Sequence, residues 1–213
     1  SKDPELLDAF KHGKDIHTKT SALIFDVPEA EVTPEQRQVG KRINFSIMYG
    51  LTPFGLSKDL GISPKEAKAY IESYFNQYAG VQTWMEQVVV QAKEDGYVST
   101  LLGRRRYTPG LHERNRNIYE AERRITINTP IQGTSADLIK LAMLCINEQL
   151  DAKGLQARMV LQIHDELVLS VPQDEVEVVT QLVEACMMGV VDGWDVPLTV
   201  STRTGKDWGE ASK

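Results

Sequence analysis

The feature of this sequence that most constrains its fold is a change of pattern near Gly96. Before that glycine, helix-start signals recur in which Asp, Thr or Ser is followed directly by Pro, at Asp3, Thr33 and Ser63. After it, short apolar runs bounded by turn residues become frequent, and these predict strands. Helices that come mostly first and strands that come mostly last are typical of an α+β fold with an antiparallel sheet.

The expected elements follow from these caps and from the spacing of apolar residues. We expect helices over residues 5–10, 15–25, 33–48, 63–78, 81–94, 114–127 and 131–153, and another within 172–191. The triplet Asn128-Thr129-Pro130 is expected to interrupt the helical run between 127 and 131. We expect strands at 97–102 and 106–108, at 157–163 and 166–170, and at 198–203.

Composition limits the class of protein. A chain of 213 residues with 41% hydrophobic residues can bury a core as one large domain or two small ones. No run approaches the ~20 apolar residues of a membrane span, and residues 1–5 lack the pattern of a signal peptide. Cys145 and Cys186 lie in apolar helical stretches without CxxC spacing. We expect buried reduced thiols rather than a disulfide, and therefore a cytoplasmic protein.

The net charge of −6 argues only mildly against a nucleic-acid partner, because the distribution of charge matters more than its sum. Acidic residues gather at both ends of the chain and within 174–184, whereas basic residues gather in the middle. Three of them, at 104–106, follow Gly103 and are either a phosphate contact or a solvated charge run. A basic face on an acidic body is therefore compatible with this sequence.

One face of the helix expected over 33–48 combines cations with aromatic rings. Residues four apart share a stripe along a helix, and this stripe holds Arg37, Lys41 and Phe45, with Tyr49 at the helix end. The opposite side is apolar and is expected to pack on the body through Val39, Ile43 and Ile47. Cations beside a flat ring suit a nucleoside triphosphate, and the alternative is a solvated helix face.

A polar triplet lies between two apolar runs in residues 159–169. His164, Asp165 and Glu166 are expected at the tip of a hairpin. Adjacent carboxylates repel each other unless a divalent cation stabilises them, as in two-metal phosphoryl transfer. An ordinary polar turn is the alternative, although this turn lacks Gly and Asn.

Arg124, Asn128 and Gln132 are also four residues apart. Side-chain amides can donate to purine N3 and pyrimidine O2, which every base pair presents in the minor groove. The alternative is capping of a helix end by Asn128 and Thr129. Nothing local makes His17 functional.

Several blocks of this chain, in this order, resemble those of family A DNA polymerases of the bacterial polymerase I type. The blocks are Asp15-Ile-His17-Thr, Arg37-x3-Lys41-x3-Phe45-x3-Tyr49-Gly50, Leu102-Gly-Arg-Arg-Arg-Tyr107, Asn128-Thr-Pro-Ile-Gln132-Gly-Thr-Ser-Ala-Asp137, Leu161-Gln-Ile-His164-Asp165-Glu166-Leu and Gly205-Lys-Asp-Trp208. The resemblance covers essentially the whole chain. Together these blocks favour the functional interpretations over the alternatives.

The resemblance implies an α+β fold with a mostly helical fingers subdomain and part of the antiparallel-sheet palm of a right-hand polymerase. The implied boundaries are 1–30 for a palm-to-fingers segment, 31–110 for the fingers and 111–213 for the C-terminal part of the palm. It implies template-directed DNA synthesis in replication and repair. The implied cofactor is Mg²⁺, with two ions in the complete active site. Its partners would be primer–template DNA and deoxynucleoside triphosphates, with no membrane, in the bacterial cytoplasm at the nucleoid.

The resemblance also implies roles for single residues. Arg37 and Lys41 match cations that hold the incoming triphosphate, and His17 matches a helper on its phosphates. Phe45 matches the ring on the sugar, where Phe goes with rejection of dideoxynucleotides, and Tyr49 matches the residue that occupies the templating-base position until the fingers close. Asp165 matches a metal ligand, and Glu166 matches its acidic neighbour in the catalytic pair. The residues that match minor-groove and primer-end contacts are Arg124, Asn128, Gln132 and His164.

The family places a further metal-binding aspartate shortly before the segment that matches residues 1–4. We therefore expect this chain to lack that aspartate, to be inactive alone, and to need the missing N-terminal part of the same polymerase. Three alternatives remain: a single-subunit RNA polymerase, a non-catalytic DNA-binding module, and a metal-dependent nuclease. Glu166 together with the sugar-facing Phe45 favours the DNA enzymes over the RNA enzymes.

Overall fold

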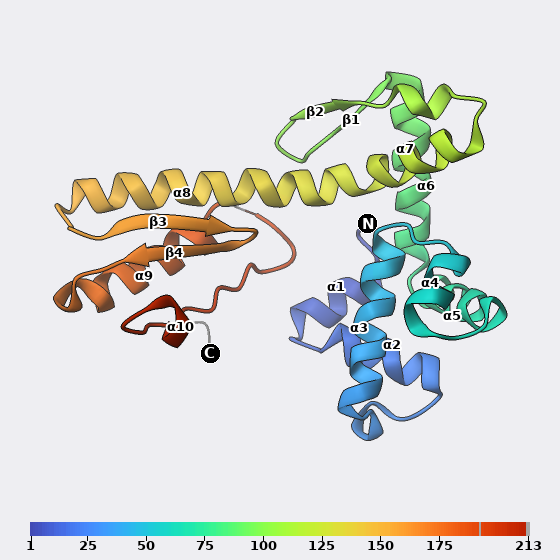
Figure 1. Ribbon diagram of the computed structural model, residues 1–213, viewed down its shortest axis with the longest axis horizontal. Helices are drawn as coiled ribbons and strands as arrows, with labels where there is room; N and C mark the ends of the chain where they lie inside the picture. The colour runs from blue at the N-terminus through green and yellow to red at the C-terminus, as the bar shows by residue number, and fades with distance from the viewer. Residues whose placement is uncertain (192, 212–213) are drawn as a thin grey trace. The chain divides into compact units, whose positions relative to one another are not determined.

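A computed structural model describes residues 1–191 and 193–211, and the chain divides into two compact units, Ser1–Gly133 and Thr134–Lys213. Unit 1 is mostly helical and carries one small hairpin (Figure 1). Its elements are α1 Pro4–Lys11, α2 Ile16–Phe25, η1 Glu29–Glu31, α3 Pro34–Met48, α4 Pro53–Leu60, α5 Pro64–Gln77, α6 Ala79–Asp95, β1 Tyr97–Ser99, β2 Arg105–Tyr107, η2 Pro109–His112, α7 Arg116–Asn128 and η3 Thr129–Gly133.

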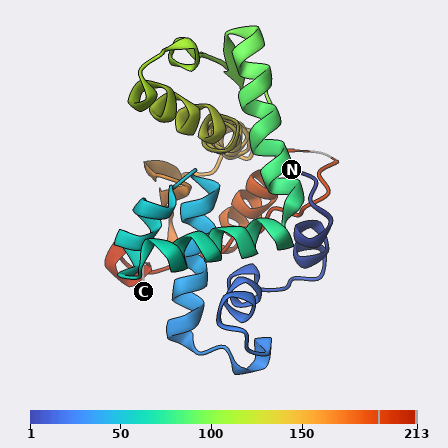
Figure 2. The ribbon, with the colours of Figure 1, turned by 90° about the vertical axis from the view of Figure 1, so that its right-hand side faces the viewer.

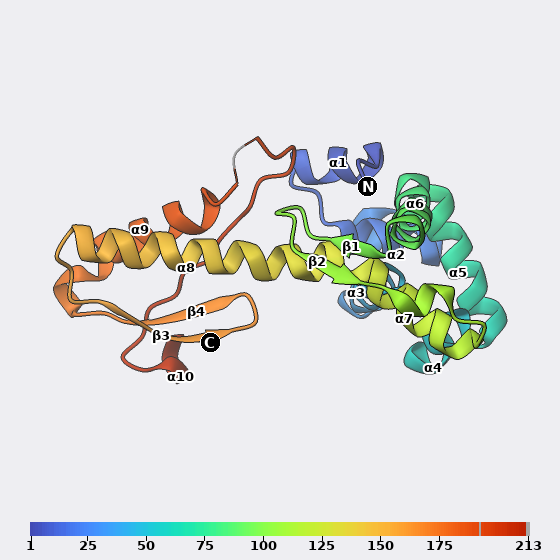
Figure 3. The same ribbon diagram turned by 90° about the horizontal axis from the view of Figure 1, so that it is seen from above.

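Unit 2 consists of a long helix, an antiparallel hairpin and a second helix that lie side by side (Figures 1 and 3). Its elements are α8 Thr134–Ala152, β3 Arg158–Ile163, β4 Glu166–Ser170, η4 Gln173–Glu175, α9 Val176–Met188 and α10 Trp208–Ala211. The helical and antiparallel content confirms the predicted α+β fold.

The predicted caps start the helices of unit 1. Asp3 accepts hydrogen bonds from the backbone N–H groups at the start of α1. Thr33 and Ser63 each form a capping box, at α3 and α5, in which the third helical residue bonds back to the cap. Asp15 is the N-cap of α2, and its side chain accepts hydrogen bonds from the backbone N–H groups of His17 and Thr18. Each of these caps satisfies backbone N–H groups that a helix start otherwise leaves without partners.

The core of unit 1 fixes which face of α3 is free. Ile43 and Ile47 are buried in a cluster with the fully buried Tyr74 of α5 and Tyr78 at the start of α6, and Val39 packs against it. The prediction that this side of α3 packs on the body is therefore confirmed. The opposite stripe is left outside this core.

Helices α2 and α3 pack closely against each other within unit 1, which Figure 2 shows from the side (both in blue). The approach is possible because position 40 is glycine: a Cβ there would overlap Ser21 Oγ and the His17 carbonyl oxygen. Ser21 Oγ lies 3.0 Å from the His17 carbonyl oxygen and 2.7 Å from that of Gln36, within donating distance of both. This contact brings the start of α2 beside the exposed stripe of α3.

The structure differs from the sequence predictions at three places: one helix was missed and two predictions are wrong. Helix α4 was not expected, although Thr52 caps it, Pro53 starts it and Gly61 ends it in the left-handed conformation. The expected interruption at 128–130 is instead a π-helical segment, η3, because a wider helical turn leaves room for Pro130 without breaking the run. Residues 198–203 are not a strand, since neither hairpin pairs with them and a strand needs a partner.

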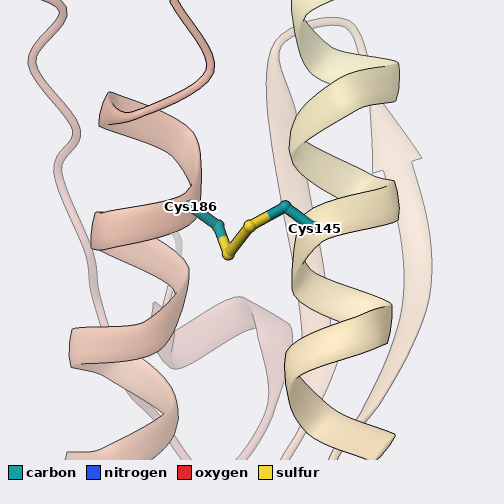
Figure 4. Close-up of a disulfide and its surroundings, with 2 residues drawn as sticks. All are labelled: Cys145 and Cys186. Atoms are coloured by element: carbon teal, nitrogen blue, oxygen red, sulfur yellow. A yellow bond between two sulfur atoms is a disulfide. The ribbon is translucent and has the colours of Figure 1, made fainter. Parts of the chain in front are cut away.

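The prediction of reduced thiols is also wrong, because Cys145 and Cys186 form a disulfide between α8 and α9 (Figure 4). The two helices pack side by side and bring the Cα atoms to 5.8 Å, within the usual range for a disulfide. The cysteines are 41 residues apart, so their meeting depends on packing that the sequence pattern does not show. Across residues 1–191 and 193–211, no helix is long and apolar enough to cross a membrane.

Candidate nucleotide and nucleic-acid site

The ring of Phe45 is the centre of the exposed stripe on α3. It is 42% exposed, and the ring of Tyr49 stacks beside it with the centroids 6.2 Å apart and the planes 21° from parallel. Lys41 Nζ lies 5.9 Å from the Phe45 centroid, which places a cation near the ring face. The centroid of the His17 ring, which comes from α2, lies 5.9 Å from the Phe45 centroid. A flat ring bordered by cationic and imidazole groups can receive a sugar or base with an attached phosphate chain.

Arg37 is held by the cap of the neighbouring helix. Its Nε donates to Asp15 Oδ2, and Asp15 Oδ1 accepts from the backbone N–H of His17 at 2.9 Å. Partial burial alone would raise the pKa of Asp15, but the hydrogen bonds from Arg37, Thr18 and the backbone outweigh it and lower that pKa to about 2. The carboxylate therefore stays ionised at neutral pH and orients both the guanidinium and the start of α2.

His17 is half-buried between the two helices. Its Nδ1 lies 3.0 Å from Asn44 Nδ2, and Asn44 is only 3% exposed. Burial lowers the pKa of His17; Asp15 acts in the opposite direction, while Arg37 and Lys41 add to the lowering. The ring is therefore biased toward its neutral form.

The three polar residues expected at a nucleic-acid groove lie at the end of α7 and in η3. Arg124 is half-buried beside the end of α3, since a Cβ at Gly50 would lie 3.4 Å from Arg124 Cγ. The side-chain oxygen of Asn128 is buried and has no hydrogen-bond partner among the residues the structure describes. Gln132 is exposed within the π-helical segment. The Thr129 hydroxyl donates back to the Ile125 carbonyl at 2.8 Å instead of capping the following helix.

The polar triplet lies at the tip of the β3–β4 hairpin in unit 2. Ile163 pairs with Glu166, so His164 and Asp165 form the two-residue turn. All three residues of the triplet are exposed, and His164 adopts a positive φ of 54°, which is uncommon for a residue with a side chain. The Gln162 side chain donates to the His164 carbonyl at 2.7 Å and braces this turn. The predicted hairpin is therefore present, with its carboxylates at the tip.

Comparisons with known proteins identify the family. A family model described as DNA polymerase family A matches residues 1–210. The chain belongs to DNA polymerase family A. It is 46% identical to DNA polymerase I of Pseudomonas aeruginosa and 46% identical to DNA polymerase I of Bacillus caldotenax, each over 211 residues, or 99% of this chain. These alignments cover 23% and 24% of the relatives, so the chain spans about a quarter of their length.

A solved family A structure is also similar: the POL domain of Pol1 from M. smegmatis in complex with DNA primer-template and dNTP. The TM-score is 0.95 at 42% sequence identity, and the match covers 100% of this chain and 37% of that chain. The fold of this chain is therefore that of the matching part of a family A polymerase domain.

The structure gathers the predicted nucleotide residues of this family A chain in unit 1 and places the predicted carboxylates in unit 2. The predictions missed Asp15 and Asn44, which hold Arg37 and His17 in place. The Asp-x-His-Thr pattern signals the cap at Asp15. Asn44 carries a weaker signal, an amide in the middle of a helix, where Asn is unfavourable unless its side chain has a specific partner.

Proposed function

We propose that this chain takes part in template-directed DNA synthesis, in which deoxynucleotides are transferred from triphosphates to a primer 3′-hydroxyl. The observation that carries the proposal is the cluster around Phe45, where Lys41, Tyr49 and His17 surround one exposed ring. The names of the relatives support it, and so does the similar M. smegmatis structure, which is a complex with DNA primer-template and dNTP. We assign the fingers to residues 31–110 and the C-terminal palm to 111–213.

In this proposal, Arg37 and Lys41 hold the triphosphate by charge, and His17 adds a hydrogen bond to a phosphate oxygen. Phe45 packs on the sugar, and its lack of a hydroxyl leads to rejection of dideoxynucleotides. Tyr49 occupies the templating position until α3 moves toward a correct pair. Asp15 holds the Arg37 guanidinium in one position before the nucleotide arrives, which reduces the ordering that binding requires.

Asp165 would hold Mg²⁺ at the hairpin tip, with Glu166 as its acidic neighbour in the catalytic pair. They are adjacent, exposed and oxygen-donating, which suits a hard divalent cation. Among the residues that the structure describes, no group of three or more His, Cys, Asp and Glu side chains could hold a metal ion. When bound, Mg²⁺ supplies activation of the attacking hydroxyl and charge neutralisation at the pyrophosphate. We propose that two ions act and that the isolated chain is inactive.

Arg124, Asn128, Gln132 and His164 would contact DNA. The side-chain oxygen of Asn128 is buried without a partner among the described residues and directly precedes a π-helical segment, and the exposed amide of Gln132 lies within that segment. Such segments are frequent at functional sites. Contacts to minor-groove acceptors do not depend on sequence, so Gln132→Ala should reduce primer extension equally for all template bases. We place the protein in the bacterial cytoplasm at the nucleoid on the strength of its bacterial relatives, since the argument from reduced thiols fails.

A chimera tests the function. This chain replaces the matching 211 residues of the Bacillus caldotenax DNA polymerase I. We expect Mg²⁺-dependent primer extension by the chimera with deoxynucleotides, and none by the isolated chain once an Asp165→Ala control excludes contaminating polymerase. A folded chimera that binds primer–template without extending it would overturn the proposal in favour of a DNA-binding module. Preferential ribonucleotide incorporation would favour an RNA polymerase.

A further inference from the structure

Asn44 makes a set of hydrogen bonds that the function proposed above does not use. It is buried in the middle of α3 and faces α2. Its Nδ2 lies 3.3 Å from the Ile16 carbonyl oxygen and 3.0 Å from His17 Nδ1, and its Oδ1 accepts from Thr20 Oγ1 at 2.9 Å. One amide therefore ties together the backbone, the ring and a buried hydroxyl of α2.

These partners decide which way the amide points. The Ile16 carbonyl can only accept a hydrogen bond, so the amide atom that faces it must be the NH₂ group. The same NH₂ group also faces His17 Nδ1, and Thr20 Oγ1 completes the arrangement by donating to the amide oxygen. Because an amide nitrogen offers only donors, Nδ1 must be the acceptor, and an accepting Nδ1 carries no proton. The proton of the neutral ring is then on Nε2.

We propose that Asn44 is a positioning residue that fixes His17 as the neutral tautomer with its proton on Nε2, ready to donate to a phosphate oxygen. Protonation of Nδ1 would direct an N–H at the donating NH₂ group, so the imidazolium is disfavoured at this position. The charged groups that face His17 are Asp15 at the start of α2 and Arg37 and Lys41 on α3. The two cations of α3 act in the same direction as Asn44 and lower the pKa of the ring; Asp15 opposes them.

The consequence concerns the chemistry of the phosphate contact. Arg37 and Lys41 already supply positive charge, and a third cation beside them would be repelled. A neutral imidazole instead supplies one directional N–H, and it does so unchanged from neutral to alkaline pH. The assignment of the ligand as a phosphate rests on the proposed function, whereas the tautomer rests on the contacts of Asn44 alone.

The tautomer is tested directly by ¹⁵N NMR of the purified chain. Its four histidines allow the His17 resonances to be assigned by their loss in His17→Ala. We expect Nδ1 to resonate as an unprotonated ring nitrogen and Nε2 as a protonated one. A proton on Nδ1 in the unmodified chain would overturn the proposal without any variant, so the outcome does not depend on whether a substitution at buried Asn44 folds.

Variants then test whether Asn44 is the cause. Asn44→Asp replaces the donor with an acceptor and should raise the pKa of His17 and move the neutral proton to Nδ1; Asn44→Leu should leave a mixture of tautomers. The matched control is Ser21→Ala, which removes a hydroxyl from the same helix contact without touching the ring. It should lower the melting temperature and leave the tautomer unchanged. An unchanged tautomer and pKa in both Asn44 variants would also overturn the proposal.

A double-mutant cycle in the chimera separates this inference from the function. Asn44→Leu should raise KM for deoxynucleotides several-fold with a smaller change in kcat, and should add little in a His17→Ala background, because both changes remove one contact. Full additivity would show that Asn44 does not act through His17. Failure of the chimera to extend primers would contradict the proposed function and leave the NMR result standing.

Discussion

The two parts of the candidate site are held in different ways. In unit 1, most side chains of the proposed nucleotide face are held by a neighbour: Asp15 binds Arg37, Asn44 binds His17, and Tyr49 stacks on Phe45. In unit 2, both carboxylates are exposed: Asp165 lies in the two-residue turn, which the Gln162 side chain braces, and Glu166 follows it at the start of β4. Contacts within this chain therefore position the side chains of the nucleotide face, whereas the positions of the carboxylates depend on the ligand that binds them.

This difference has a physical reason. Cations and rings can be arranged in advance by hydrogen bonds and packing, and doing so reduces the ordering that a ligand must bring about. Two adjacent carboxylates repel each other, so their favourable arrangement arises only with a cation. Substitutions in unit 2 should therefore act on catalysis, and substitutions in unit 1 on nucleotide affinity.

The largest expected effect is that of Asp165→Asn in the chimera. Loss of a metal-binding carboxylate should lower kcat by about 100-fold or more, while binding of the nucleotide by unit 1 persists. Primer-extension kinetics would measure it, and Asp174→Asn, an exposed carboxylate of η4, is the matched control. A change in KM alone would show that Asp165 belongs with the nucleotide face.

The next effect is that of Lys41→Ala in the chimera. A charge-assisted contact to phosphate contributes about 1.5–3 kcal/mol, so KM for deoxynucleotides should rise by roughly tenfold or more. Affinity for primer–template should stay the same. The control is Lys65→Ala, which removes an exposed lysine from α5 and should change neither KM for deoxynucleotides nor the affinity for primer–template. Equal loss of DNA affinity would contradict the assignment of this stripe to the nucleotide.

Reduction of the Cys145–Cys186 disulfide should lower the stability of unit 2 without changing that of unit 1. Both cysteines lie in unit 2, and the bond closes a loop between α8 and α9. A native disulfide contributes about 2–4 kcal/mol, so a reductant should lower the melting temperature of unit 2 and leave unit 1 unchanged. Calorimetry of the chain and of a Cys145→Ser/Cys186→Ser variant would show this. A fall in both transitions would mean that the units do not unfold independently.

Gly40→Ala should weaken unit 1 alone. The added methyl group would overlap Ser21 and the backbone of His17 and would push α2 away from α3. Overpacking of this kind costs about 1–3 kcal/mol, and the separation should also disturb the His17 ring. Thermal unfolding followed by circular dichroism measures the first effect, with Gln38→Ala on the exposed side of α3 as control. An unchanged melting temperature would show that the helices can move apart without cost.

How far the sequence predicts this molecule depends on how local each cause is. Caps at Asp3, Thr33 and Ser63 act within a few residues, so the helices that they start were predicted. The hairpin of β3 and β4 was predicted for the same reason, and so was the stripe on α3. Contacts between elements were not predicted, because the meeting of Asn44 with His17 and that of the two cysteines depend on how helices pack.

The smallest effect expected is an acid dependence of unit 1 that comes from Asp15. Its pKa falls from an ordinary value of 3.8 to about 2 on folding, so the folded chain stabilises the ionised form of the carboxylate. The resulting stability is present above pH about 4 and is lost as the pH falls toward 2. Asp15→Asn keeps a helix cap but loses the charge. The melting temperature of this variant should therefore lie below that of the unmodified chain at pH 5, and this deficit should shrink between pH 5 and pH 2.

Because the carboxylate side chain is 38% exposed, the deficit should be small and should decrease further in high salt. Melting curves of the chain and of Asp15→Asn at several pH values, with Asp174→Asn as control, would decide it. A deficit that stays constant down to pH 2 would show that Asp15 acts as a cap and not through its charge on Arg37.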